Sequence, residues 1–260
     1  MILILTYHKV LPGLDHESGF YSIQAEQLER QLELLAQSGL HALSPEELVE
    51  NGPAASRAYF LSFDDGTTDH YKIVLPMLAR YGCRGVFFVP TAWLDRPGFL
   101  SSKQVIELSQ AGQTIGLHSH EHRRLDQLGE KEIRMQMDAS RQIIGDLTGK
   151  PPLFFAPVGG YMNRTVRRMA LESGIRVIRT LEWGYNHEFD GAALQSIPVN
   201  RHCTERKFRQ LLEFRRRSTM LYAAKEITKK MIPGRAYKSL RRFVFEHSAE
   251  KWAAWRRTRD

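Results

Sequence analysis

Cysteine is scarce in this chain, since only Cys83 and Cys203 occur among its 260 residues. Two cysteines do not form the framework of a small disulfide-bonded domain. They also lack the CxxC spacing that is typical of cysteine-ligated zinc. We therefore expect neither a disulfide scaffold nor a cysteine zinc site.

Long apolar runs are lacking as well, and no stretch reaches the roughly 20 apolar residues that cross a bilayer. The first residues, MILILTYH, hold an apolar run of only about five residues, which is too short for a signal peptide. They show neither a basic leader nor a small-residue cleavage site. We expect this segment to be the buried first strand of a cytoplasmic protein.

Acidic residues are scarce only in the C-terminal part of the chain. Residues 204–260 contain 17 Lys and Arg against 6 Asp and Glu, whereas residues 1–203 contain 20 basic and 23 acidic ones. The net charge of +8 is therefore a property of the tail. This asymmetry predicts a main domain over residues 1–217 and a basic, amphipathic helical tail over residues 218–260.

The tail interleaves its basic residues with aromatic and aliphatic ones, among them Tyr222, Phe243, Trp252 and Trp255. This pattern fits a segment that lies on an anionic membrane surface, which would bring the protein to the inner face of a membrane. Helices that cover the main domain with their charges toward water would give the same pattern. Nucleic-acid binding ranks last, because no recognisable motif accompanies the charge.

Short apolar runs alternate with amphipathic stretches along the main domain. Helical spacing or caps predict helices over residues 23–38, 68–81, 102–111, 131–147 and 164–173, with Asn163 as a cap. Strands are predicted over residues 2–6, 59–63, 85–89, 114–117, 153–156, 176–180 and 196–199. This alternation favours a parallel sheet with helices outside, and about seven strands favour a distorted (β/α)7-type barrel, closed or nearly so.

Polar clusters follow the apolar runs, at the strand ends where such barrels carry functional residues. Asp64 and Asp65 follow one strand, and adjacent side chains there cannot point the same way. One carboxylate can thus bind a metal while the other faces a water, although a solvated turn has the same residues. His118 and His122 follow another strand, and on a helical turn both would reach one cation. Two histidines and a carboxylate leave positions open for water and substrate.

Together these motifs resemble the NodB-type polysaccharide deacetylase family (carbohydrate esterase family 4). LSFDDG at residues 61–66 is similar to the family's TFDDG motif, and HSHEH at residues 118–122 to its H-(S/T)-x-x-H motif. LTYHKV at residues 5–10 resembles the opening strand of one branch, and FAPVGGYMN at residues 155–163 resembles the third motif. The resemblance covers about residues 1–210.

The resemblance implies that Asp65, His118 and His122 bind one divalent metal ion and that Asp64 is the general base. The ion is expected to be zinc, with cobalt, nickel or iron as alternatives. Such an ion lowers the pKa of bound water and polarises an amide carbonyl. Substrate contacts are expected from the loop after residue 156, where a backbone N–H would face the oxyanion, and from these residues: His8, Pro157, Val158, Gly159, Tyr161 and Trp183.

Two departures from the family pattern stand out. Ala156 replaces the arginine that orients the catalytic aspartate in much of the family, so that group must come from elsewhere, with His8 as one candidate. His202 fits loosely the histidine that protonates the departing amine. Residues 182–187 occupy the place of the fourth motif and either shape a sugar pocket or form a plain loop.

The leading hypothesis is a hydrolase that removes an N-acetyl group from an amino sugar, in a glycan or glycan precursor for a surface polysaccharide. The glycan would be lipid-linked or nucleotide-linked. An amidase, a deformylase or an O-acetyl esterase would use the same metal site. A catalytically silent sugar-binding protein is the alternative from another class, because of Ala156 and the uncertain acid.

Overall fold

The computed structural model describes residues 1–16, 18–50 and 57–214. The predicted tail, residues 218–260, lies outside these described residues. No helix among the described residues is long and apolar enough to cross a membrane.

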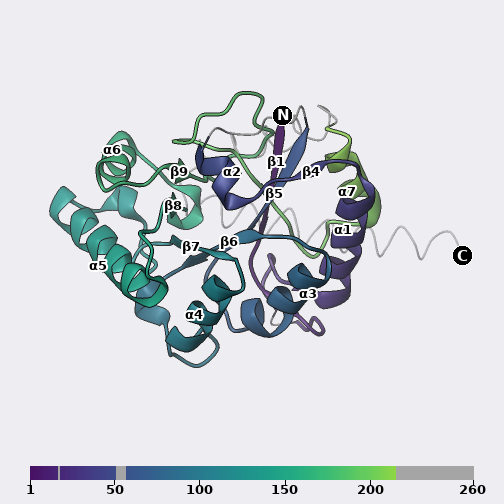
Figure 1. The fold of residues 1–260 in the computed structure, drawn as a ribbon, viewed down its shortest axis with the longest axis horizontal. Coiled ribbons are helices and arrows are strands. Elements are labelled where there is room, and N and C mark those ends of the chain that lie inside the picture. The colour runs from purple at the N-terminus through teal and green to yellow at the C-terminus, as the bar shows by residue number, and fades with distance from the viewer. Residues whose placement is uncertain (17, 51–56, 215–260) are drawn as a thin grey trace, which may run out of the picture. The chain divides into compact units, whose positions relative to one another are not determined.

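Parallel strands form one curled sheet at the centre of the molecule (Figure 1). Its order is β10 (Ile197–Pro198), β1 (Ile2–Tyr7), β5 (Ala58–Phe63), β6 (Gly85–Val89), β7 (Thr114–Leu117), β8 (Phe154–Phe155) and β9 (Val177–Ile178). A short strand, β4 (His41–Ala42), also pairs with β5, and β2 (Val10–Leu11) pairs with β3 (Ile23–Gln24). Between β9 and β10 the described chain shows only an isolated bridge from Arg179 to Leu194. The predicted (β/α)7-type barrel is confirmed, and its wall is a half-barrel that stays open at this seam.

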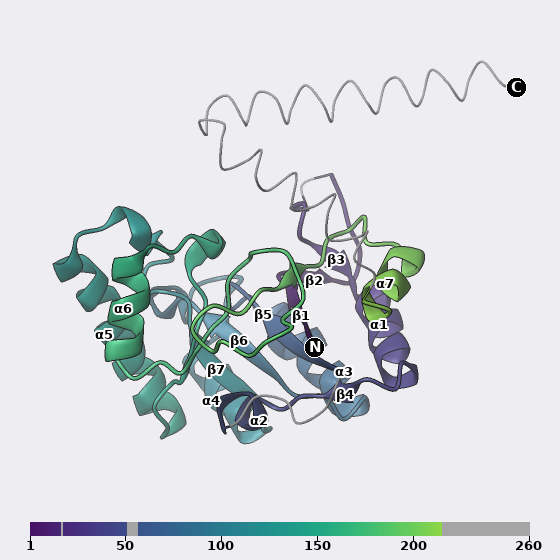
Figure 2. The same cartoon turned by 90° about the horizontal axis from the view of Figure 1, so that it is seen from above.

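Helices cover the outside of the sheet in two groups that flank it (Figure 2). On one side α1 (Ala25–Gln37) lies beside α7 (Glu205–Leu212), and on the other α5 (Glu130–Thr148) lies beside α6 (Arg164–Glu172). The helices α2 (Pro45–Glu50), α3 (Leu75–Arg80) and α4 (Ser102–Gln110) complete the cover. The Asn163 side chain accepts a hydrogen bond from the Val166 N–H at 2.9 Å, so the predicted cap of α6 is confirmed.

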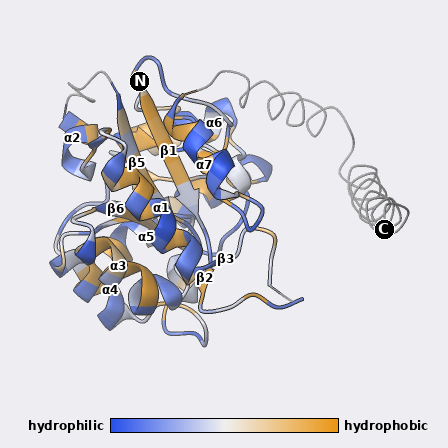
Figure 3. Ribbon diagram, turned by 90° about the vertical axis from the view of Figure 1, so that its right-hand side faces the viewer, coloured by the Kyte–Doolittle hydropathy of each residue, from blue (hydrophilic) through white to orange (hydrophobic). Residues whose placement is uncertain are grey.

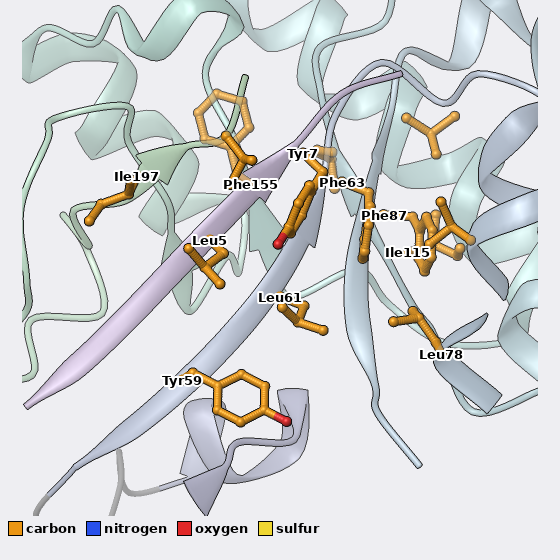
Figure 4. Packing of buried hydrophobic residues seen from close by; sticks show 14 of the residues in the cluster. Leu5, Tyr7, Tyr59, Leu61, Phe63, Leu78, Phe87, Ile115, Phe155 and Ile197 are labelled. Atoms are coloured by element: carbon orange, nitrogen blue, oxygen red, sulfur yellow. The ribbon is translucent and has the colours of Figure 1, made fainter. Parts of the chain in front are cut away.

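Hydrophobic residues line both faces of the strands, and most of β1 appears orange in Figure 3. All six residues of β1 are buried. Leu3, Leu5 and Tyr7 belong to the main core cluster, whereas Ile2 and Ile4 belong to a second cluster on the other face. The alternation follows from the two-residue period of a strand. In Figure 4 the rings of Tyr7, Phe63 and Phe87 stack side by side, with Tyr7 and Phe63 5.4 Å apart.

The helix predicted over residues 68–81 differs from the structure, which has a π-helical turn over His70–Val74 before α3. The Leu75 N–H reaches back five residues to the His70 carbonyl. Pro76 explains the wider turn, because proline has no N–H and its ring clashes with the carbonyl four residues earlier in an α-helix. The turn also lets His70 Nε2 donate to the His8 carbonyl at 2.8 Å.

Replacing Asn163 by alanine removes the cap acceptor at the start of α6. We expect the free energy of unfolding to fall by about 1 kcal/mol, measured by urea denaturation. The control is Asn163→Asp, which keeps the acceptor for the Val166 N–H but loses the amide donor to the Asp126 carbonyl. Equal losses for both variants would show that the amide donor, not the cap, stabilises this turn.

Candidate active site

Three strand ends bring the polar side chains together at one edge of the sheet. Tyr7 is in register with Phe63, and Val89 with Leu117. The residues that follow β1, β5 and β7 therefore emerge side by side, as parallel strands require. These residues are His8, Asp64, Asp65 and the segment 118–122.

Asp65, His118 and His122 form a compact cluster of potential metal ligands. The Nε2 atoms of His118 and His122 lie 3.4 and 3.1 Å from Asp65 Oδ1. One ligand atom from each residue lies within 4.8 Å of the other two. The structure thus brings together the three side chains that the sequence assigned to one cation.

The backbone achieves this convergence in a different way from the one expected. Residues 118–122 form no helical turn; they follow β7 as a bent loop in which Ser119 and His122 both have φ of 57°. The expected geometry, with positions i and i+4 on one helical face, is therefore wrong. The two left-handed residues fold the loop back so that the His118 and His122 rings lie 5.0 Å apart. Asp65, with φ of 78°, is also left-handed, and its carboxylate lies against the two imidazoles whereas that of Asp64 lies against Arg179.

The electrostatics of the cluster favour a charged carboxylate. Burial raises the pKa of Asp65, but hydrogen bonds with His118 and His122 outweigh burial and hold that pKa well below its usual range. Burial lowers the pKa of His118, while the hydrogen bond to Asp65 and the charge of Asp64 raise it overall. Asp65 is therefore ionised and can act as an anionic ligand for a cation.

The donor set fits a divalent transition-metal ion. His118 Nδ1 lies 2.7 Å from the Ala156 carbonyl oxygen, which can only accept a hydrogen bond. When the imidazole is neutral its proton therefore stays on Nδ1, and Nε2, which otherwise donates to Asp65, presents a lone pair to a cation. A backbone partner of this kind is what orients metal-bound histidines in proteins.

Asp64 is paired with an arginine that the sequence interpretation missed. Its carboxylate is buried and accepts a hydrogen bond from Arg179 Nη2, which is itself only 1% exposed. Phe155 pairs with Ile178 between β8 and β9, so the same register places Arg179 directly beside Ala156. The charge that is absent at residue 156 therefore comes from the neighbouring strand. A charged residue at the end of the apolar segment IRVIR, residues 175–179, was the available signal.

His8 lies on the other side of Asp64, with Nε2 3.9 Å from Asp64 Oδ2. Burial lowers its pKa, which keeps the imidazole neutral near pH 7. The Tyr21 ring stacks on it at 5.0 Å. His8 therefore lines the site, whereas Arg179 provides the ionic contact that orients Asp64.

The loop after β8 supplies potential backbone donors. Gly160 and Tyr161 donate their N–H groups to the carbonyls of Pro157 and Val158, and proline has none. Only Val158 and Gly159 can thus offer an N–H to a substrate from this loop. Gly160 has φ of 73°, and a Cβ there would lie 2.7 Å from the Leu181 nitrogen, so this turn requires glycine.

The sequence also predicts that Tyr161 and Trp183 contact the substrate. The Tyr161 ring lies under the Arg124 guanidinium at 3.4 Å. Trp183 is partly buried and packs against the main core. Asn186 bridges the backbone of Ile2 at the far end of β1, so this part of the 182–187 loop leads away from the site.

His202 is exposed, and its ring lies 5.7 Å from the Phe20 ring. Within the described ranges no hydrogen bond or ion pair joins its imidazole to Asp64 or Asp65. The geometry therefore gives its assignment as a general acid no support. Trp93, which the sequence interpretation did not single out, lies over His122 with ring centroids 4.4 Å apart.

Comparison with known proteins gives this arrangement a context. Residues 51–178 match the family model described as polysaccharide deacetylase. YxkH of Bacillus subtilis, which is assigned by name to the polysaccharide deacetylases, is 25% identical over 186 residues, covering 70% of this chain and 64% of YxkH. The peptidoglycan-N-acetylglucosamine deacetylase PgdA of Listeria monocytogenes is 29% identical over 133 residues, covering 49% of this chain and 27% of PgdA. The chain thus spans less than two thirds of either relative.

Two solved structures share the fold. The deacetylase PplD of Streptococcus pyogenes, in complex with acetate, superposes with a TM-score of 0.74 at 22% identity, covering 81% of this chain and 97% of PplD. IcaB from Ammonifex degensii gives 0.72 at 22% identity, with 82% and 96% covered. The matched family region contains Asp64, Asp65, His118 and His122. The chain belongs to the polysaccharide deacetylase family of the NodB type.

Proposed function

We propose that this protein is a metal-dependent hydrolase that removes N-acetyl groups from an amino sugar in a glycan. The observation that carries the proposal is the pairing of Asp64 with Arg179 beside the cluster of Asp65, His118 and His122. The pairing keeps one carboxylate buried and oriented while its neighbour takes part in the potential metal site. Such a division of roles is what water-driven amide hydrolysis needs.

The residues of the chain have distinct tasks in this reaction. Asp65, His118 and His122 would hold a divalent ion, preferentially zinc, which supplies a Lewis acid for the acyl oxygen and lowers the pKa of a water. Asp64 accepts the proton of the attacking water. Val158 or Gly159 donates a backbone N–H to the oxyanion. Asp64 then returns its proton to the departing amine nitrogen, because among the described residues His202 makes no hydrogen bond or ion pair with Asp64 or Asp65.

The cellular setting belongs to the same proposal. The glycan is a precursor or product of surface polysaccharide synthesis, and the protein is cytoplasmic and meets lipid-linked substrate at the inner membrane surface through its basic tail. The name of PgdA, which specifies N-acetylglucosamine in peptidoglycan, supports an amino-sugar substrate. An amidase or deformylase acting on another C–N bond is the second candidate, because the same metal ligands and base would hydrolyse any amide that reaches them.

A catalytically silent sugar-binding protein is less well supported. That alternative rested on the missing arginine at residue 156 and on the uncertain acid. Arg179 provides the charge from beside Ala156, and Asp64, once protonated, can serve as the acid.

Replacing Asp64 by asparagine removes the base without changing the shape of the side chain. Acetate release from N-acetylglucosamine oligomers is expected to fall about 10²- to 10⁴-fold in kcat. Metal content, measured on the same preparation, should remain, which separates loss of the base from loss of the ion. Acetate release at the wild-type rate would remove Asp64 from this role.

Metal binding is expected at one ion per chain and should depend on His122. Mutation of a residue that only hydrogen-bonds to a metal ligand lowers metal affinity by roughly 10- to 100-fold. His122→Ala removes a ligand itself, so a larger loss of metal affinity is expected. The matched control is His120→Ala, from the same loop, whose Nδ1 contacts Thr91 Oγ1 at 2.8 Å instead of the cluster. Elemental analysis after dialysis against zinc measures both. Equal zinc content in the two variants would contradict the assignment.

Arg179→Met leaves the Asp64 carboxylate buried without a counter-charge. The free energy of unfolding should fall by about 3–5 kcal/mol, since the remaining charge is uncompensated. The double variant Arg179→Met with Asp64→Asn removes both charges and is expected to recover part of this loss. Denaturant unfolding of the four proteins gives the coupling energy. Additive losses would show that the two groups do not stabilise each other.

A further inference from the structure

Phe20 and Tyr21 form an exposed aromatic corner beside the site. Each is 38% exposed, and their rings meet edge to face at 85° with centroids 5.1 Å apart. The other large apolar side chains that are exposed in the described ranges, Met135, Leu171 and Phe189, are not sequence neighbours. This corner is therefore a distinct feature of the surface.

A histidine ring lies against each of the two aromatic rings of the corner. The Tyr21 ring stacks on His8 at 5.0 Å with an interplanar angle of 19°, and the Phe20 ring lies 5.7 Å from that of His202. The stacked rings extend from the active site outward, because His8 Nε2 lies 3.9 Å from Asp64 Oδ2. A ligand that lies on Phe20 and Tyr21 can therefore extend along His8 to Asp64.

Hydrogen bonds hold the corner in place. Arg201 donates from its side chain to the Ser18 and Gly19 carbonyls. The side chain of Gln27, on α1, donates to the carbonyls of Asn200 and Cys203 at 3.2 and 3.1 Å, which fixes the segment that carries His202. A surface fixed in this way loses little conformational entropy when it binds a ligand.

The geometry points to a sugar-binding subsite made by Phe20, Tyr21 and His202, which takes the pyranose ring next to the one that reacts. A pyranose has a C–H face that packs on an aromatic ring and a rim of hydroxyls that needs polar partners, and the corner offers apolar ring faces beside an imidazole. The inference rests on the proposed function and makes it more specific, because it requires a substrate of at least two sugar units. It also gives His202 a binding role in place of acid catalysis.

A membrane surface is the other class of ligand for exposed aromatic side chains. The structure favours the sugar, because the Tyr21 ring is stacked flat on His8 instead of projecting outward. In addition, the corner is continuous with the reaction site.

The test compares the full-length chain on N-acetylglucosamine and on its pentamer, with acetate release as the readout. The measured quantity is the gain in kcat/KM on going from the single sugar to the pentamer. Phe20→Ala is expected to reduce this gain about tenfold, mainly through KM for the pentamer. His202→Ala should act in the same way, whereas loss of a general acid would lower kcat on both substrates. The matched control is Phe189→Ala, which is equally exposed (39%) and whose ring lies against Gly191.

The outcomes separate the two proposals. An unchanged gain in Phe20→Ala, or a fall in kcat on both substrates in His202→Ala, overturns the subsite. If the wild-type chain releases no acetate from either sugar, the proposed function fails, and saturation-transfer NMR with the pentamer still tests the subsite through the signal lost in Phe20→Ala. Loss of pelleting with phosphatidylglycerol vesicles in Phe20→Ala, together with an unchanged gain, would assign the corner to a membrane instead.

Discussion

The buried ion pair between Arg179 and Asp64 is the contact on which the site depends most. Both side chains are almost fully excluded from water, so each charge is tolerable only because the other lies against it. The pair also joins the ends of β5 and β9, next to the seam where the sheet is open. The same contact therefore holds the carboxylate and the last strand of the half-barrel in place.

Asp64 and Asp65 show how neighbours in sequence acquire different chemistry. The backbone is left-handed at Asp65, and the two carboxylates have different partners: an arginine for Asp64 and two imidazoles for Asp65. His118 is fixed in turn by the carbonyl of Ala156, the residue that follows β8, so this residue contributes to the site through its backbone although its side chain is only a methyl group. Each charged group thus has its own partner, and the partners come from different strands.

Much of this could be predicted from the sequence, because its signals are local. The apolar runs give β6 and β7 their observed bounds, and the motifs at residues 61–66 and 118–122 identify three side chains that meet. Arg179 could not be assigned in the same way, since its role depends on the register of β8 against β9, which no short motif encodes. The bent path of residues 118–122 and the π-helical turn at His70–Val74 likewise arise from tertiary contacts and from Pro76.

The position of Arg179 has a consequence for how such chains are classified. A motif search that expects arginine at residue 156 would score this protein as a degenerate copy, whereas the guanidinium enters from one strand farther along the sheet. The requirement is a positive charge beside Asp64, and either of two adjacent strands, β8 or β9, can be followed by the residue that supplies it. Before a relative that lacks the motif arginine is set aside as inactive, the residue that pairs with the motif position on the adjacent strand should be checked for a positive charge.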